Sequence, residues 1–98
     1  MLEVGGWNIQ TEYRCQGLHA SKTELKAKET LTVTAQIANT FLDGSRVTLV
    51  VDGQPVRTKW AWARGGRIDP VTFEVNFSAT GTHTVSVGVR HVEVRVSE

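Results

Sequence analysis

Cysteine and histidine are the side chains of this sequence best suited to metal binding or nucleophilic catalysis. Cys15 and His19 are four residues apart, and His83 or His91 could join them in space. A structural zinc site usually takes closely spaced ligand pairs from two separate elements, and this sequence contains only one loose pair. A Cys–His nucleophile needs a third group that orients the histidine, and no such group can be identified. The sequence therefore predicts no metal, no cofactor and no catalytic residues.

A second cluster combines tryptophan with basic side chains. Its members are Arg57, Lys59, Trp60, Trp62, Arg64 and Arg67. Such mixtures are used for nucleic acids and sugars, because flat rings stack on indoles. Alternation along an extended strand instead puts Trp60 and Trp62 with Val56 on the inner face of a sheet. Two indoles are bulky for a small core, so we expect one of them at the rim. We predict a contact surface there, made of Trp60, Trp62, Arg64 and Arg67.

The net charge argues against two classes of partner. Eleven basic residues face ten acidic ones, for a formal net charge of +1. Binding to DNA phosphates usually needs a marked basic excess, and a polybasic membrane anchor needs one too. No apolar run approaches the length of a membrane span. We therefore predict neither nucleic-acid binding nor membrane insertion.

The sequence leaves the cellular compartment open. Cys15 is the only cysteine, so it cannot form an internal disulfide, and we expect a buried, inert thiol. The start, residues 1–6, lacks the basic and apolar segments of a signal peptide. Either the protein is cytoplasmic or the sequence is a piece of a longer chain.

Most of the sequence alternates between apolar and polar residues, which is the period of a half-buried β-strand. Residues 30–39 are the clearest example, and their apolar face carries Leu31, Val33, Ala35 and Ile37. The same pattern predicts strands at residues 7–15, 47–51, 56–62, 71–77, 83–89 and 92–96. Ser21–Glu24 fits a helix capping box, but we expect no helix because no apolar period of 3.6 follows it.

Turn residues separate these strands. Asp52-Gly53 suits a tight hairpin, because both central residues of such a turn take positive φ. Gly65-Gly66 and residues 78–81 interrupt the pattern in the same way. His83 follows the second of these turns, and we expect it to close the end of the core and to hydrogen-bond a nearby backbone group. His91 is expected to face solvent.

The strand count and the length together predict the fold class. The chain has 98 residues, which is enough for one hydrophobic core and too little for two. Seven or eight short strands at this length are typical of an all-β, immunoglobulin-like antiparallel β-sandwich. A five-stranded barrel is the second choice. Residues 1–98 are thus expected to form a single domain, with residues 1–17 as a candidate extra N-terminal strand that pairs within it.

Four pieces of the sequence resemble the cell-adhesion-related domain family of bacteria and archaea (CARDB). They are residues 25–35 (LKAKETLTVTA), 37–40 (IANT), 50–53 (VVDG) and 80–87 (TGTHTVSV). Lys28 stands where such domains often place a turn glycine, and His83 stands where they often place tyrosine. The resemblance implies an immunoglobulin-like or fibronectin type III-like module, repeated in surface or secreted proteins, and implies no catalytic residues.

These observations predict a non-catalytic module of a larger cell-surface or secreted protein that acts as a spacer or adhesion unit. Its partner would be a protein or glycan at the cell surface, and the isolated module would be a monomer. One alternative is a carbohydrate-binding module that uses Trp7, Trp60 or Trp62 for stacking. Another is a filament or coat subunit that pairs through its N-terminal strand. A cytoplasmic location also stays open.

Overall fold

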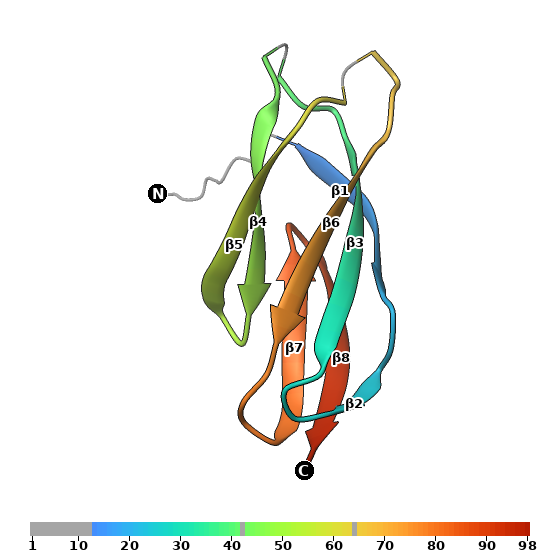
Figure 1. Cartoon of the computed structure of the whole chain (residues 1–98). Helices are drawn as coiled ribbons and strands as arrows, with labels where there is room; N and C mark the ends of the chain where they lie inside the picture. The colour runs from blue at the N-terminus through green and yellow to red at the C-terminus, as the bar shows by residue number, and fades with distance from the viewer. Residues whose placement is uncertain (1–12, 42, 64) are drawn as a thin grey trace, which may run out of the picture.

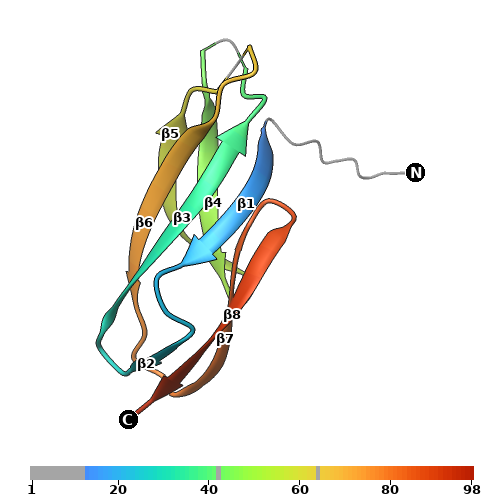
Figure 2. The ribbon, with the colours of Figure 1, turned by 90° about the vertical axis from the view of Figure 1, so that its right-hand side faces the viewer.

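The computed structural model describes residues 13–41, 43–63 and 65–98, and they form two β-sheets packed face to face (Figures 1 and 2). The first sheet has the order β1-β3-β6 and the second has the order β2-β8-β7-β4-β5. The strand bounds are β1 (Arg14–Ala20), β2 (Glu24–Lys26), β3 (Thr30–Ala38), β4 (Ser45–Val51), β5 (Gln54–Ala61), β6 (Asp69–Asn76), β7 (Gly81–Val87) and β8 (Arg90–Ser97). The prediction of an all-β sandwich of seven to eight strands is confirmed.

The strand order is that of an immunoglobulin-type sandwich. The set β8-β7-β4-β5 matches the G-F-C-C′ order of the larger sheet in variable-type domains, and β1-β3-β6 corresponds to the strands A, B and E. One pairing is not antiparallel: β2 runs parallel to β8. The backbone N–H of Ser21 still bonds to β3, whereas the carbonyl of Thr23 already accepts from Arg95 of β8. The chain therefore crosses from one sheet to the other without reversing direction.

The core lies between the two sheets and follows the predicted alternation. Inward side chains of β3 are buried, and so are Phe73 of β6, Leu49 of β4 and Val85 of β7. The buried face of β3 consists of Leu31, Val33, Ala35 and Ile37. Val89, the last apolar residue of the strand predicted at residues 83–89, does not face the core and is 85% exposed. It lies in the tight turn between β7 and β8, where Val87 pairs with Arg90.

The tight turns have the predicted backbone conformation. Asp52 and Gly53 have φ values of 52° and 84°, and they connect β4 to β5 as a two-residue hairpin loop that requires positive φ at both positions. Lys28 also has a positive φ, of 74°. This is the position where the resemblance suggests a turn glycine, the residue for which this conformation carries no steric cost.

The prediction for the face of β5 is wrong, and a β-bulge is the reason. Val50 pairs with Pro55, but Leu49 pairs with Arg57, so that Val56 is an extra residue in β5. One extra residue exchanges the two faces of the strand beyond it. Lys59 is therefore on the inner side, where its ammonium lies 5.9 Å from the centroid of the Phe73 ring. Trp60 is on the outer face.

The N-terminal strand also differs from its predicted extent. The expected strand at residues 7–15 lies mostly outside the described residues. Within them, β1 continues past Gly17 to Ala20, with a register shift between Cys15 and Gly17. Cys15 pairs with Ile37 of β3, so the described part of this segment pairs within its own domain. No helix forms at Ser21–Glu24, as predicted.

Candidate binding surface

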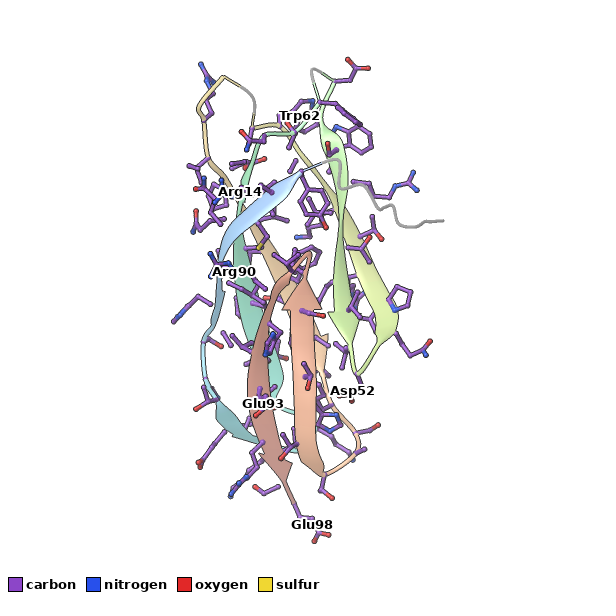
Figure 3. The ribbon with its side chains drawn as sticks, turned by 180° about the vertical axis from the view of Figure 1, so that it is seen from behind. Arg14, Asp52, Trp62, Arg90, Glu93 and Glu98 are labelled. Carbon is purple, nitrogen blue, oxygen red and sulfur yellow. The ribbon has the colours of Figure 1, made fainter. Side chains whose placement is uncertain are left out.

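Large apolar side chains are exposed together at one end of the sandwich. Four of them are between 44% and 60% exposed, and they come from the loop after β3, from the end of β5 and from the loop before β6. We call this set the aromatic pole: Phe41, Trp60, Trp62 and Ile68. Figure 3 shows Trp62 at the end of the molecule opposite Glu98. Exposed large apolar side chains that gather at one end of a domain are candidates for an interaction site.

The ring of Trp60 is held against the protein by the turn before β4. Its Nε1–H donates a hydrogen bond of 2.9 Å to the carbonyl oxygen of Asp43. Gly44 lies against the ring with φ of 93°, and a Cβ there would overlap the indole and come within 2.8 Å of the Ala61 carbonyl oxygen. Glycine is required at this position both by the conformation and by the close approach of the ring. Trp60 is therefore fixed in one orientation.

Trp62 continues the same outer face and meets Trp60 edge to face. The two ring centroids are 6.1 Å apart and the ring planes make an angle of 61°. The backbone N–H of Trp62 donates to the Asp69 carboxylate over 3.0 Å. The backbone N–H of the next residue, Ala63, donates to the Thr40 hydroxyl, and the Ala63 carbonyl oxygen accepts from the Thr40 backbone N–H. These bonds bring the loop that carries Phe41 beside the end of β5.

The predicted contact surface is partly brought together. Trp60 and Trp62 are adjacent and exposed, and Arg67 is exposed in the loop that follows. Arg64 lies outside the described residues. The sequence reasoning missed Phe41 and Ile68 as members, and it missed Arg46, which pairs with Trp60 across β4 and β5.

Because the bulge exchanges the two faces of β5, two cationic side chains of this strand point inward and do not belong to the predicted contact surface. Arg57 and Lys59 face β6 and line a shallow groove of about 330 Å³ between the two sheets, together with Thr72, Phe73 and Glu74. Inward-pointing charge, a proline and a bulge are devices that keep edge strands from pairing with other chains. Pro55 and the bulge at Val56 complete this set on β5. We interpret the groove as protection of the edge.

A second polar arrangement joins the β4–β5 hairpin to β7, away from the aromatic pole. His83 Nδ1 lies 2.6 Å from Oδ2 of Asp52, and His83 Nε2 lies 2.8 Å from the carbonyl oxygen of Ala79. The other carboxylate oxygen of Asp52 accepts from the backbone N–H of Thr84. The Phe77 ring packs against the imidazole with centroids 4.7 Å apart. The predicted backbone hydrogen bond of His83 is confirmed, and Asp52 is a partner that the sequence did not indicate.

These contacts shift the pKa values of both side chains. The hydrogen bond to the Asp52 carboxylate, followed by the one to Ala79, raises the pKa of His83. The same bond to His83, followed by the N–H of Thr84, lowers the pKa of Asp52. Each shift favours the charged form of its group, so Asp52 and His83 form an ion pair at pH values between their two pKa values.

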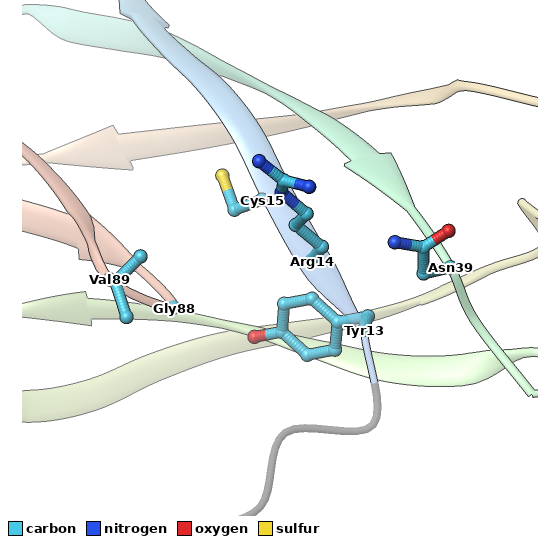
Figure 4. Close-up of a pocket in the computed structure, with 6 residues that line it drawn as sticks. All are labelled: Tyr13, Arg14, Cys15, Asn39, Gly88 and Val89. Atoms are coloured by element: carbon cyan, nitrogen blue, oxygen red, sulfur yellow. The ribbon is translucent and has the colours of Figure 1, made fainter.

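Cys15 lies beside a shallow pocket near the start of β1 (Figure 4). The pocket has a volume of about 340 Å³ and is lined by Tyr13, Arg14, Cys15, Asn39, Gly88 and Val89. The Cys15 thiol is buried, as predicted, and donates to the carbonyl oxygen of Gly17. Burial raises the pKa of this thiol, which keeps it protonated and weakens it as a nucleophile or metal ligand.

His19 and His91 are exposed, and His83 is bonded to Asp52. Among residues 13–41, 43–63 and 65–98, no three His, Cys, Asp or Glu side chains come together as a metal site would require. In the same part of the chain, no helix is both long enough and apolar enough to span a bilayer.

The sequence matches no protein-family model, and no curated protein is significantly similar to it. The class that the structure defines is an immunoglobulin-type β-sandwich with an exposed aromatic end.

Proposed function

We propose that this chain is a non-catalytic, immunoglobulin-like module of a larger cell-surface or secreted protein and that it acts as a spacer or adhesion unit. The observation that carries the proposal is the aromatic pole. Among the described residues, four large apolar side chains face solvent at one end, whereas the other strands bury an apolar core between the sheets. Exposed indoles in contact with one another have a free-energy cost in water that a bound partner would remove.

The shape of the domain suits a spacer. The molecule is 43 Å long. β1 begins in the half that carries the aromatic pole, and β8 ends at the other end of the long axis (Figures 1 and 3). Neighbouring domains joined through these strands would be held apart along the axis of the sandwich, with the pole facing one of the two junctions.

Two local features support the resemblance to the CARDB family and, with it, an extracellular location. Lys28 has the left-handed conformation that a turn glycine would take in such domains. His83 fills the place of the expected tyrosine and makes a backbone hydrogen bond from it. At both positions the residue differs from the one that is common in the family, but the backbone conformation or the hydrogen bond expected there is kept.

The proposal includes a monomeric state in isolation and a protein or glycan as the partner. A stable protein dimer buries about 800 Å² on each partner, which is more than four partly exposed side chains supply. A filament subunit is the less favoured candidate. Strand addition needs a free strand, and the part of the N-terminal segment that the structure describes, in β1, is already paired with β3 of the same chain.

Adhesion by beads tests the proposal. Beads coated with the full chain are passed over immobilised extracellular-matrix proteins and cell-wall polysaccharides, and retention under flow is measured. We expect retention on at least one surface and its loss in the double variant Phe41→Ser, Trp62→Ser. Val89→Ser is the matched control, because Val89 is a large apolar side chain outside the pole that is 85% exposed. No retention on any surface, or equal retention of the double variant, would refute an adhesive role.

A further inference from the structure

We propose that the aromatic pole is a glycan site, in which one sugar of a β-1,4-linked hexopyranose chain stacks on Trp60 against Trp62. The inference rests on the proposed adhesive function and names its ligand class. Its basis is the held orientation of the Trp60 ring and the angle that the Trp62 ring makes with it.

Trp60 supplies the floor of the site. Its N–H is already bonded to the Asp43 carbonyl oxygen, so the part of the ring that faces solvent is apolar. Gly44 lies against the same Nε1–Cδ1 edge of the ring, and the indole is 45% exposed. A flat aromatic surface that is held in place loses little conformational entropy when a ligand binds. Stacking is the interaction that such a surface offers best.

Trp62 supplies a wall. Its ring stands at 61° to that of Trp60, with centroids 6.1 Å apart, and it is the most exposed of the four side chains. Two rings at this angle form a corner, whereas two coplanar rings would form a long flat platform. A corner fits one flat, rigid ring and the edge of its neighbour in a chain.

A β-1,4-linked pyranose with equatorial hydroxyls matches this corner chemically. Its two faces carry axial C–H groups and are apolar, and its hydroxyls form a polar rim. Charged groups that could bond this rim lie next to the floor. Arg46 pairs directly with Trp60 on the outer face of the sheet, and the exposed Asp43 precedes Gly44 in the turn. In an α-1,4-linked chain the axial glycosidic bond bends the chain, so successive rings do not continue in the plane of the ring that stacks on Trp60.

The described side chains of the pole offer an apolar area that one sugar ring and its neighbour can cover. An aromatic side chain buries about 150–250 Å² when it is fully covered, so four side chains that are about half exposed, three of them aromatic, offer roughly 400 Å². Nucleic acid is disfavoured because the chain has a net charge of only +1. A sugar ring and its neighbour match the area that the pole can offer.

Titration of the full chain with defined oligosaccharides tests the proposal. The probes are cellohexaose and chitohexaose, with maltohexaose as the α-1,4-linked comparison, and the readouts are calorimetry and tryptophan fluorescence. We expect saturable binding of at least one β-1,4-linked probe and a change in tryptophan emission. The α-1,4-linked probe should bind at least tenfold more weakly.

Variants assign the binding to the corner. Trp62→Ala should weaken binding roughly tenfold or more, because it removes the ring that contacts the edge of the stacked sugar and its neighbour in the chain. Trp60→Phe keeps a flat ring and should retain part of the affinity. Val89→Ser should bind like the parent, and thermal unfolding of every variant confirms that it is folded.

Three results would overturn the glycan site. They are no saturable binding of either β-1,4-linked probe, unchanged binding by a folded Trp62→Ala variant, and equal binding of maltohexaose. Beads that adhere to a protein surface through the pole while both oligosaccharides fail would refute the glycan site and leave the adhesive function standing.

Discussion

The ion pair between Asp52 and His83 should make the stability of the domain depend on pH. Both nitrogens of the His83 ring face acceptors, the Asp52 carboxylate at 2.6 Å and the Ala79 carbonyl oxygen at 2.8 Å. A neutral imidazole has one N–H and can satisfy only one of them as a donor, whereas the imidazolium satisfies both. Protonation of His83 therefore strengthens the link between the β4–β5 hairpin and the loop before β7.

The direction of each pKa shift gives the pH range. The pKa of His83 is raised, so its contribution to stability is complete below its ordinary pKa of about 6.5 and is lost as pH rises through the raised value. The pKa of Asp52 is lowered, so its contribution is complete above its ordinary pKa of about 3.9 and is lost as pH falls through the lowered value. The ion pair thus stabilises the fold most between about pH 4 and pH 6.5.

Asp52→Asn is the perturbation that isolates the charge. Asparagine tolerates the positive φ of 52° and keeps a side-chain oxygen that can accept from Thr84. A hydrogen bond to a charged group contributes about 1.5–3 kcal/mol. The Asp52 side chain is 48% exposed, so screening by solvent reduces this to about 1 kcal/mol. At pH 5.5 the thermal midpoint should fall by about 4–8 °C, and at pH 9 the variant should approach the parent.

Thermal unfolding followed by circular dichroism at pH 5.5 and pH 9 measures both differences. Asp43→Asn is the matched control, since Asp43 also lies in an exposed turn but bonds Trp60 through its backbone carbonyl. The same loss of stability at both pH values, or no loss at pH 5.5, would contradict the ion-pair reasoning.

Three further substitutions, the first of them with a matched control, test the core, the contact between Gly44 and Trp60 and the turn at Lys28. Leu49→Ala should lower the free energy of unfolding by about 2–5 kcal/mol through lost burial and a cavity, whereas Thr48→Ala, on the opposite face, should change it by less than about 1 kcal/mol in urea unfolding. Gly44→Ala should cost about 1–3 kcal/mol and shift tryptophan emission, because its methyl group would displace the Trp60 ring; an unchanged spectrum would contradict the contact. Lys28→Gly should raise the thermal midpoint by roughly 2–4 °C, because relief of the left-handed conformation slightly outweighs the added chain entropy; a lower midpoint would refute this.

Part of the candidate site was predictable from local sequence. Trp60 and Trp62 were identified by their type and spacing, and both are exposed at one end. The face assigned to them was wrong, because a one-residue bulge cannot be read from alternation that continues unchanged on both sides of it. Phe41 and Ile68 lie in loops without periodic pattern, so only the contacts between those loops bring them to the pole.

The sequence by itself determined the strands from β3 to β8, the inward faces of β3, β4 and β6, and the hairpin at Asp52-Gly53, but not β2 or most of β1. These features follow from alternation and from the backbone preferences of single residues, which act over a few positions. Only the tertiary structure decided which side of β5 faces the core and which loops meet at the aromatic pole. It also paired Asp52 with His83, 31 residues further along the chain. Those outcomes depend on register between strands and on packing of distant segments, and neither quantity is encoded in a local pattern.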